Sequence, residues 1–204
     1  MKKLIVLLVL LTSLIQNSIA TAATPSVSPY QVIETTGNSL FARIANNQEA
    51  LKKFPELMRD IVEEELMPSV DYQYAAFKIL GKHLRNTTKE QRAKFVTAMR
   101  AYLVRTYANA LTQYSDQKVL FEPAAKLRED ARAASVDIKI IDDGRPDIKI
   151  TFQMRKDRQS QQWRAYDMVV EGISLISSKQ AEFNRKISEL GLEQVTVELA
   201  SIAT

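Results

Sequence analysis

Few residues of this chain belong to the types that catalyse reactions or hold metal ions. His83 is the only histidine, and the chain contains no cysteine. No triad serine or metal partner stands at a recognisable spacing from His83, so we expect it to be structural. The lack of cysteine excludes disulfides, thiolate metal sites and a lipid anchor attached through an amino-terminal cysteine.

Three other polar groups could carry chemistry. Glu63-Glu64-Glu65 could bind a cation, but consecutive helical residues point in different directions, which favours a solvated face. Asp142-Asp143-Gly144 could belong to a calcium loop, but the ring of oxygen ligands is missing and a hairpin turn fits better. Tyr166 and Asp167 are the residue types of some isomerase pockets. As neighbours on a strand they should face opposite sides, so Asp167 is expected to be structural, bonding backbone or Arg164.

The amino terminus has the pattern of a secretory signal. Lys2 and Lys3 precede an apolar run from Leu4 to Ile15, and Ala20-Thr21-Ala22 offers small residues for cleavage. A membrane anchor is the competing interpretation, but a spanning helix needs about 20 apolar residues. We therefore predict a signal peptide over 1–22, cleaved after Ala22 or else after Ala23, and a location in a bacterial periplasm.

The remaining chain, residues 23–204, is expected to form one domain with a substantial core. Its formal charge falls from +4 to +2 when Lys2 and Lys3 are removed. Basic residues are scattered among acidic residues along the chain instead of clustering, so no nucleic-acid partner is expected. Some basic positions could meet an acidic partner or lipid phosphates, although solvated helix positions explain them as well: Lys82, Arg85, Arg92 and Lys94.

Apolar spacing predicts helices in the first half. They cover 29–46 after a Ser28 cap, 55–67, 71–80 with Asp71 as cap and Gly81 at the exit, and 87–111. Thr87 and Glu90 have the spacing of a capping box for the last of these helices. Because its apolar stripe is wide, we expect this helix to be the main wall facing a sheet.

Alternation of apolar and polar residues replaces the helical spacing after Pro123. Strands are predicted near 136–140, 148–154 and 163–171, with the strand from Trp163 at the centre, and a short earlier strand is predicted near 118–121. Helices over 179–190 and 192–202 follow. The fold class is α+β, a three- to four-stranded antiparallel curved sheet packed against a helical layer. The pattern fits a filled core or an apolar cavity equally well.

Several stretches of the chain are similar to one known family. They are Met67-Pro68-Ser69-Val70-Asp71, Leu80-Gly81-Lys82, Gln91 to Phe95, Thr106-Tyr107, Gly144-Arg145-Pro146 and above all Trp163 to Ser178, which contains Tyr-Asp and then Glu-Gly-Ile-Ser-Leu. From about Pro29 to the carboxyl end the chain resembles the MlaC or toluene-tolerance family. Leu84 departs from the aromatic residue that many members have after the Gly-Lys turn.

The resemblance implies a periplasmic carrier with a cone related to the nuclear-transport-factor-like (NTF2-like) fold and an apolar lipid cavity. It implies phospholipid as cargo without a cofactor, and two partners: an MlaA-type outer-membrane lipoprotein with a porin, and an MlaD-type MCE protein of an inner-membrane ABC transporter. The carrier is expected to be a monomer that maintains outer-membrane lipid asymmetry. Alternation and the family architecture together predict lipid contacts at Phe77, Leu80, Val96, Met99, Leu103, Tyr107, Ile138, Ile140, Ile150, Phe152, Tyr166, Met168, Val170 and Ile173.

Two other functions compete with the carrier. One is an enzyme, because cone folds of this kind also house isomerases. The other is a periplasmic chaperone, which would expose apolar patches and bind peptides instead of enclosing a lipid. We favour the carrier, and no enzymatic activity or metal site is expected.

Overall fold

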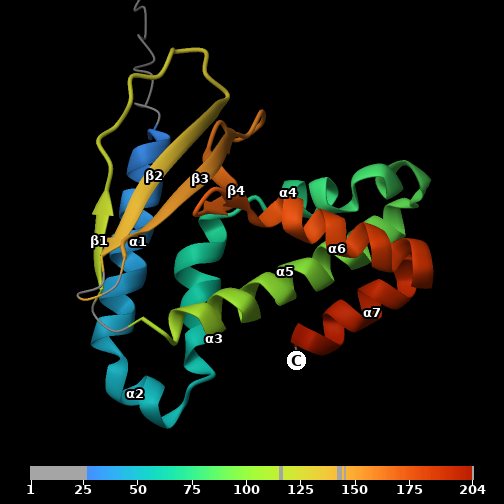
Figure 1. Ribbon diagram of the computed structural model, residues 1–204, viewed down its shortest axis with the longest axis horizontal. Helices are drawn as coiled ribbons and strands as arrows, with labels where there is room; N and C mark the ends of the chain where they lie inside the picture. Colours follow the sequence, from blue (N-terminus) through green and yellow to red (C-terminus); the bar gives the residue numbers. More distant parts are fainter. Residues whose placement is uncertain (1–26, 115–116, 142–143, 145, 204) are drawn as a thin grey trace, which may run out of the picture.

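The computed structural model describes residues 27–114, 117–141, 144 and 146–203. A sheet with helix α1 (Pro29–Asn46) along it forms one part, and a group of helices extends away from that sheet (Figure 1). The signal peptide predicted over 1–22 lies outside the described residues. So do Asp142, Asp143 and Arg145 of the predicted turn.

Capping side chains determine where the first helices begin. The Ser28 hydroxyl accepts a hydrogen bond from the Gln31 backbone, and the Gln31 side chain accepts one from the Ser28 backbone, which confirms the predicted start of α1. Asp71 caps α4 (Tyr72–Leu80), and Gly81 ends it at a φ of 51°. The short α2 (Gln48–Lys53) lies where no helix was predicted.

The helix predicted over 55–67 is divided into shorter pieces. They are α3 (Leu57–Ile61), a π-helical turn η1 (Val62–Leu66) and a 3-10 turn η2 (Met67–Ser69). Apolar spacing does not distinguish these turns from a continuous α-helix, because a π turn changes the period only locally.

Helix α5 (Lys89–Leu111) uses a different capping box from the predicted one. Thr88 and Gln91 exchange the two capping hydrogen bonds, so the assignment to Thr87 and Glu90 was wrong. The two pairs have the same spacing and similar chemistry, and the sequence could not separate them. The Thr87 hydroxyl instead donates to the Leu84 carbonyl at 2.8 Å, at the end of the 3-10 turn η3 (Gly81–Asn86).

The predicted role of α5 as the main wall facing the sheet was also wrong. α5 packs chiefly on α7 (Leu192–Ala203), α4 and α3, whereas α1 packs on β2 and β4, and α4 and α6 also contact β4. The reason is the width of its apolar stripe, which serves two separate cores. Phe95 and Met99 belong to one core, whereas Val104 and Ala108 belong to the other.

The sheet is antiparallel and has five strands in chain order, not three or four. They are β1 (Lys118–Phe121), β2 (Ala133–Ile141), β3 (Ile148–Lys156), β4 (Trp163–Val170) and β5 (Ile173–Ser174). The central strand is therefore β3, and the placement of β4 at the centre was wrong. β5 has only two residues, too few for alternation to predict a strand.

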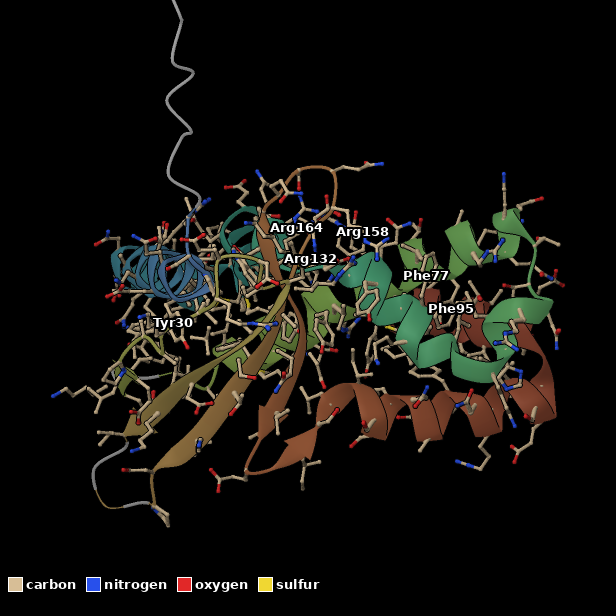
Figure 2. The ribbon with its side chains drawn as sticks, turned by 90° about the horizontal axis from the view of Figure 1, so that it is seen from above. Tyr30, Phe77, Phe95, Arg132, Arg158 and Arg164 are labelled. Carbon is tan, nitrogen blue, oxygen red and sulfur yellow. The ribbon has the colours of Figure 1, made fainter. Side chains whose placement is uncertain are left out.

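The chain ends in two helices that close the helical part. Ser174 caps α6 (Leu175–Leu190), which begins before the predicted Lys179, and Gly191 ends it as predicted. Figure 2 shows Phe77 and Phe95 inside the helical part, and Tyr30 beside the sheet. The α+β class with an open, curved antiparallel sheet is confirmed.

Candidate functional site

One face of the sheet carries apolar side chains from all five strands. Residues that pair directly across neighbouring strands share a face, so the register identifies the members. We call this surface the apolar sheet face, and its members include Val119, Phe121, Val136, Ile138, Ile140, Ile148, Ile150, Phe152, Met154, Ala165, Met168, Val170 and Ile173. The structure therefore brings together the sheet residues predicted to contact lipid, namely Ile138, Ile140, Ile150, Phe152, Met168, Val170 and Ile173.

Burial decreases along the apolar sheet face from one end to the other. Met154 is fully buried, and its neighbourhood is covered by Ile33 of α1. At the opposite end Ile148 is 41% exposed and Ile173 is 62% exposed. The apolar surface thus continues from a packed core to the solvent beside the β4–β5 turn. Ile148 was not predicted as a contact, although its alternation with Ile150 could have indicated it.

A β-bulge in β4 changes the expected alternation. Ala165 pairs with Met154, and Asp167 pairs with Gln153, which leaves Tyr166 as the extra residue. Strict alternation would place Tyr166 on the same face of β4 as Met168. Because of the bulge, Ala165 lies on that face instead. The Tyr166 ring instead meets Tyr74 of α4 edge to face, with centroids 5.1 Å apart.

Asp167 connects β4 to the start of α6. Its carboxylate accepts hydrogen bonds from the Ser174 hydroxyl at 2.6 Å, the Ile176 backbone at 3.0 Å and the Met168 backbone at 2.8 Å. This confirms the structural role with backbone partners. Arg164 is not among those partners, since it donates to Gln162. With its oxygens engaged, Asp167 is not arranged as a free acid or base.

Tyr107 is an α5 side chain that approaches β4. Desolvation, followed by the negative charge of Asp167, raises the pKa of Tyr107 to about 12. The side chain is nevertheless only half-buried, and it packs on the core shared by α1, α3 and α5. Tyr107 therefore stays neutral near pH 7 and presents a largely apolar ring.

The other predicted contacts of the helices lie in a different core. Leu80 and Met99 are fully buried there, and Phe77, Val96 and Leu103 pack against it. That core is formed by α4, α5, α6 and α7. The structure therefore does not join these residues to the apolar sheet face, because α4 and α5 direct them toward neighbouring helices.

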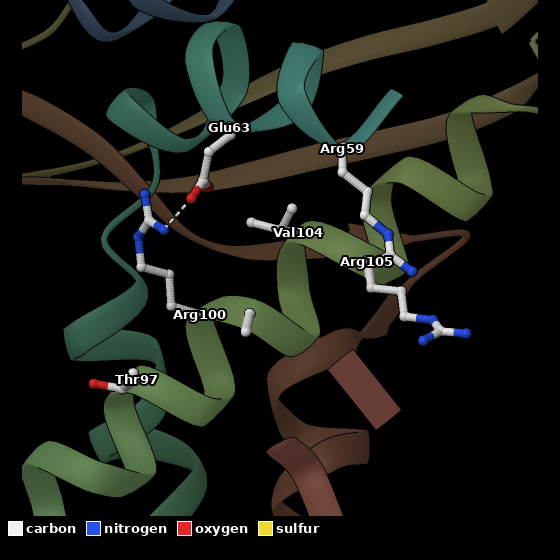
Figure 3. A pocket seen from close by; sticks show the side chains of 7 residues that line it. Arg59, Glu63, Thr97, Arg100, Val104 and Arg105 are labelled. Atoms are coloured by element: carbon white, nitrogen blue, oxygen red, sulfur yellow. Dashed lines mark hydrogen bonds and ion pairs between the residues drawn. The ribbon is translucent and has the colours of Figure 1, made fainter. Parts of the chain in front are cut away.

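Two small pockets lie beside α3 and α5, away from the apolar sheet face. One measures about 240 Å³ and is lined by Arg59, Glu63, Thr97, Arg100, Ala101, Val104 and Arg105 (Figure 3). The other measures about 190 Å³ and is lined by Pro55, Glu56, Met58, Arg59, Ala108, Asn109 and Thr112. None of the predicted lipid contacts lines either pocket, so the lipid cavity stays a prediction.

The acidic run is paired rather than simply solvated, which corrects that expectation. Glu63 forms an ion pair with Arg100 of α5, whereas Glu64 and Glu65 pair with Arg43 of α1 at 2.5 Å and 2.8 Å. The π turn that carries these residues thus links two helices. Among the described residues no cluster of histidine, aspartate and glutamate suits a metal ion.

Comparisons with known proteins agree with this architecture. The sequence profile of the MlaC protein family matches residues 34–201. The chain is also 31% identical over 200 residues to the intermembrane phospholipid transport system binding protein MlaC of Haemophilus influenzae, covering 98% of this chain and 92% of that protein. The chain belongs to the MlaC family.

Two further matches extend the description of this MlaC-family chain. The toluene tolerance protein ttg2D of Pseudomonas putida is 27% identical over 149 residues, covering 72% of this chain and 67% of that protein. A phospholipid-binding protein of Ralstonia solanacearum, solved in complex with a phospholipid, superposes with a TM-score of 0.76 at 19% identity. That match covers 87% of this chain and 97% of the other, and it confirms the fold. No helix among the described residues is long and apolar enough to span a membrane.

Proposed function

We propose that this MlaC-family chain is a periplasmic phospholipid carrier that holds acyl tails against the apolar sheet face. The observation that carries the proposal is the change in burial along this face. Its side chains are buried at Met154 and exposed to solvent at Ile148 and Ile173. Such a surface gives a tail a way in from solvent toward an interior of half-buried side chains. The phospholipid held by the Ralstonia solanacearum relative, which shares the fold, supports the assignment.

The energy of hydration requires the tails to be enclosed. Two acyl chains have on the order of 30 methylenes, each worth about 0.8 kcal/mol when removed from water. Leaving half of them wet would cost roughly 12 kcal/mol, too much for a carrier that extracts lipid from a bilayer.

Tail entry displaces side chains, because the inner part of the apolar sheet face, around Met154 and Val136, is packed. The half-buried residues Ile140, Ile150, Met168 and Val170 are the ones that give way, together with Tyr107 of α5. Fully buried Met154 and Val136 remain as the closed end. In this arrangement the headgroup stays outside, beside the β4–β5 turn.

The carrier acts after removal of residues 1–22, as a single monomeric domain over 23–204. It exchanges phospholipid with an MlaA-type lipoprotein and porin complex in the outer membrane and with an MlaD-type MCE protein of an inner-membrane ABC transporter. It uses no cofactor and has no enzymatic activity. The family relationship supports these assignments.

Native mass spectrometry of protein purified without added lipid tests the carrier directly. We expect a mass increase that collision releases as phospholipid. A chaperone would instead carry peptides, and a lipid-free protein that takes up no phospholipid from vesicles would contradict the proposal.

A matched pair of substitutions tests the proposed entrance. Ile148→Asp places a charge on the open end of the apolar sheet face, whereas Leu120→Asp places one at similar exposure opposite Lys139, on the other face. Because a carboxylate in contact with hydrocarbon is strongly disfavoured, we expect Ile148→Asp to reduce bound phospholipid about tenfold or more. Leu120→Asp should retain it. Equal lipid contents in the two variants would place the entrance elsewhere.

A further inference from the structure

The two small pockets lie next to each other and form one groove along α5. Arg59 lines both, and their α5 residues run from Thr97 to Thr112. At 1.5 Å per residue this stretch of helix is roughly 22 Å long. The opposite wall consists of Pro55 and Glu56 before α3, Met58 of α3 and Glu63 of the π turn. We call this feature the α3–α5 groove.

The first pocket of the groove has an excess of positive charge. Its lining includes Arg59, Arg100 and Arg105 but only one acid, Glu63. Glu63 pairs with Arg100, while Arg59 and Arg105 extend toward the other side of the pocket (Figure 3). Arg105 is a half-buried residue, and it makes no ion pair or hydrogen bond with any described residue. An arginine without a partner favours an incoming carboxylate or phosphate.

The same pocket also offers a hydrogen-bond acceptor. Glu63 Oε1 pairs with Arg100, but its Oε2 is buried and accepts no hydrogen bond within the described chain. A buried acceptor without a donor is unfavourable, so a ligand that donates there is stabilised. The occupant should therefore bring both negative charge and an N–H or O–H donor.

The shape and lining of the groove favour a peptide over a small anion. The second pocket is lined by Met58, Ala108 and Thr112 and carries Glu56, features that a phosphate ion would not use. The small, exposed side chain of Ala101 allows another backbone to approach α5 closely. A concave groove also fits a peptide segment better than the plane of a bilayer.

We propose that the α3–α5 groove binds an acidic peptide segment of a protein partner. A carboxylate of that segment pairs with Arg105, a donor of the segment bonds Glu63 Oε2, and small apolar side chains fill the second pocket. This extends the proposed carrier function, because the groove is a docking surface separate from the apolar sheet face. The partner can therefore bind while the lipid entrance stays free.

Site-specific photo-crosslinking in host cells tests the proposal. A benzoylphenylalanine placed at Ala101 or Thr112, both exposed in the groove, should crosslink to a protein segment rich in Asp or Glu, identified by mass spectrometry. The same group at Ser188, exposed on α6, is the control and should not crosslink to that segment. Crosslinks to lipid, or none at either groove position, would overturn the proposal.

Charge reversal supplies the matched variants. Arg105→Glu should lower the crosslink yield about tenfold, whereas Arg185→Glu, an exposed arginine on α6, should change it less than about twofold. Arg105→Gln replaces Arg105→Glu if the latter melts at a lower temperature than the wild type. An unchanged crosslink yield in the Arg105 variant would contradict the proposed binding of an acidic segment in the α3–α5 groove. Both variants should keep their bound phospholipid, so loss of docking is distinguishable from failure of the carrier function.

Discussion

Replacing Asp167 with alanine should loosen the connection between β4 and α6. The carboxylate joins these elements through hydrogen bonds from the Ser174 hydroxyl and the Ile176 backbone. Each hydrogen bond to a charged group contributes about 1.5–3 kcal/mol to stability. Because such contributions are not fully additive, we expect the free energy of unfolding to fall by about 3–4 kcal/mol.

The measurement is urea unfolding followed by circular dichroism, with a thermal melt beside it. For a chain of this size, a loss of about 3 kcal/mol corresponds to a fall in Tm of roughly 6–12 °C. Asp130→Ala is the matched control. The Asp130 side chain is 78% exposed, and its carboxylate forms a surface ion pair with the Arg128 guanidinium at 3.6 Å. That control should change stability by less than about 0.5 kcal/mol.

A double-mutant cycle with Ser174 checks the reasoning. Ser174 also caps α6 by accepting from the Ser177 backbone at 3.0 Å, so Ser174→Ala alone should cost about 1–2 kcal/mol. In the double variant the two losses should overlap by about 0.5–1.5 kcal/mol, because both remove the same bond. If Asp167→Ala destabilises the protein no more than Asp130→Ala does, the hydrogen bonds of Asp167 do not hold α6 to β4.

Two further predictions concern Tyr107 and the link between α4 and the sheet. Since desolvation raises the pKa of Tyr107 to about 12, its stabilising effect is complete below pH 10 and disappears as the pH rises to 12. The free energy of unfolding of Tyr107→Phe should therefore depend less on pH between 10 and 12 than that of the wild type. Identical pH profiles for the two proteins would contradict the desolvation of the Tyr107 hydroxyl. Asp71 pairs with Arg155 at 2.8 Å, so Asp71→Asn should lower the free energy of unfolding by about 1–3 kcal/mol in urea. Glu49→Gln, which breaks the exposed ion pair with Lys52, should change the free energy of unfolding by less than about 0.5 kcal/mol. If Asp71→Asn destabilises the protein no more than Glu49→Gln does, the ion pair of Asp71 with Arg155 does not stabilise the contact between α4 and the sheet.

Much of the secondary structure was predictable because its signals are local. Ser28 and Asp71 each mark a helix start with a side chain that bonds a backbone three residues ahead. Alternation in Ile148 to Met154 identified a strand with one apolar face, and the register confirms that its partners share that face. The motif from Trp163 to Ser178 also pointed to the MlaC family, and the family profile that matches residues 34–201 confirms it.

Only the tertiary structure decided which elements meet. Val96 and Tyr107 belong to one apolar stripe in the sequence, yet they pack on different cores, because the neighbours of α5 are set by the whole chain. The bulge at Tyr166 and the two-residue β5 depend on pairing with distant strands, which spacing along the chain does not encode. The sequence by itself determined the apolar periods, the caps of α1 and α4, and the family. The arrangement of α3 beside α5, and with it the groove around Arg105, exists only once long-range packing brings those helices together.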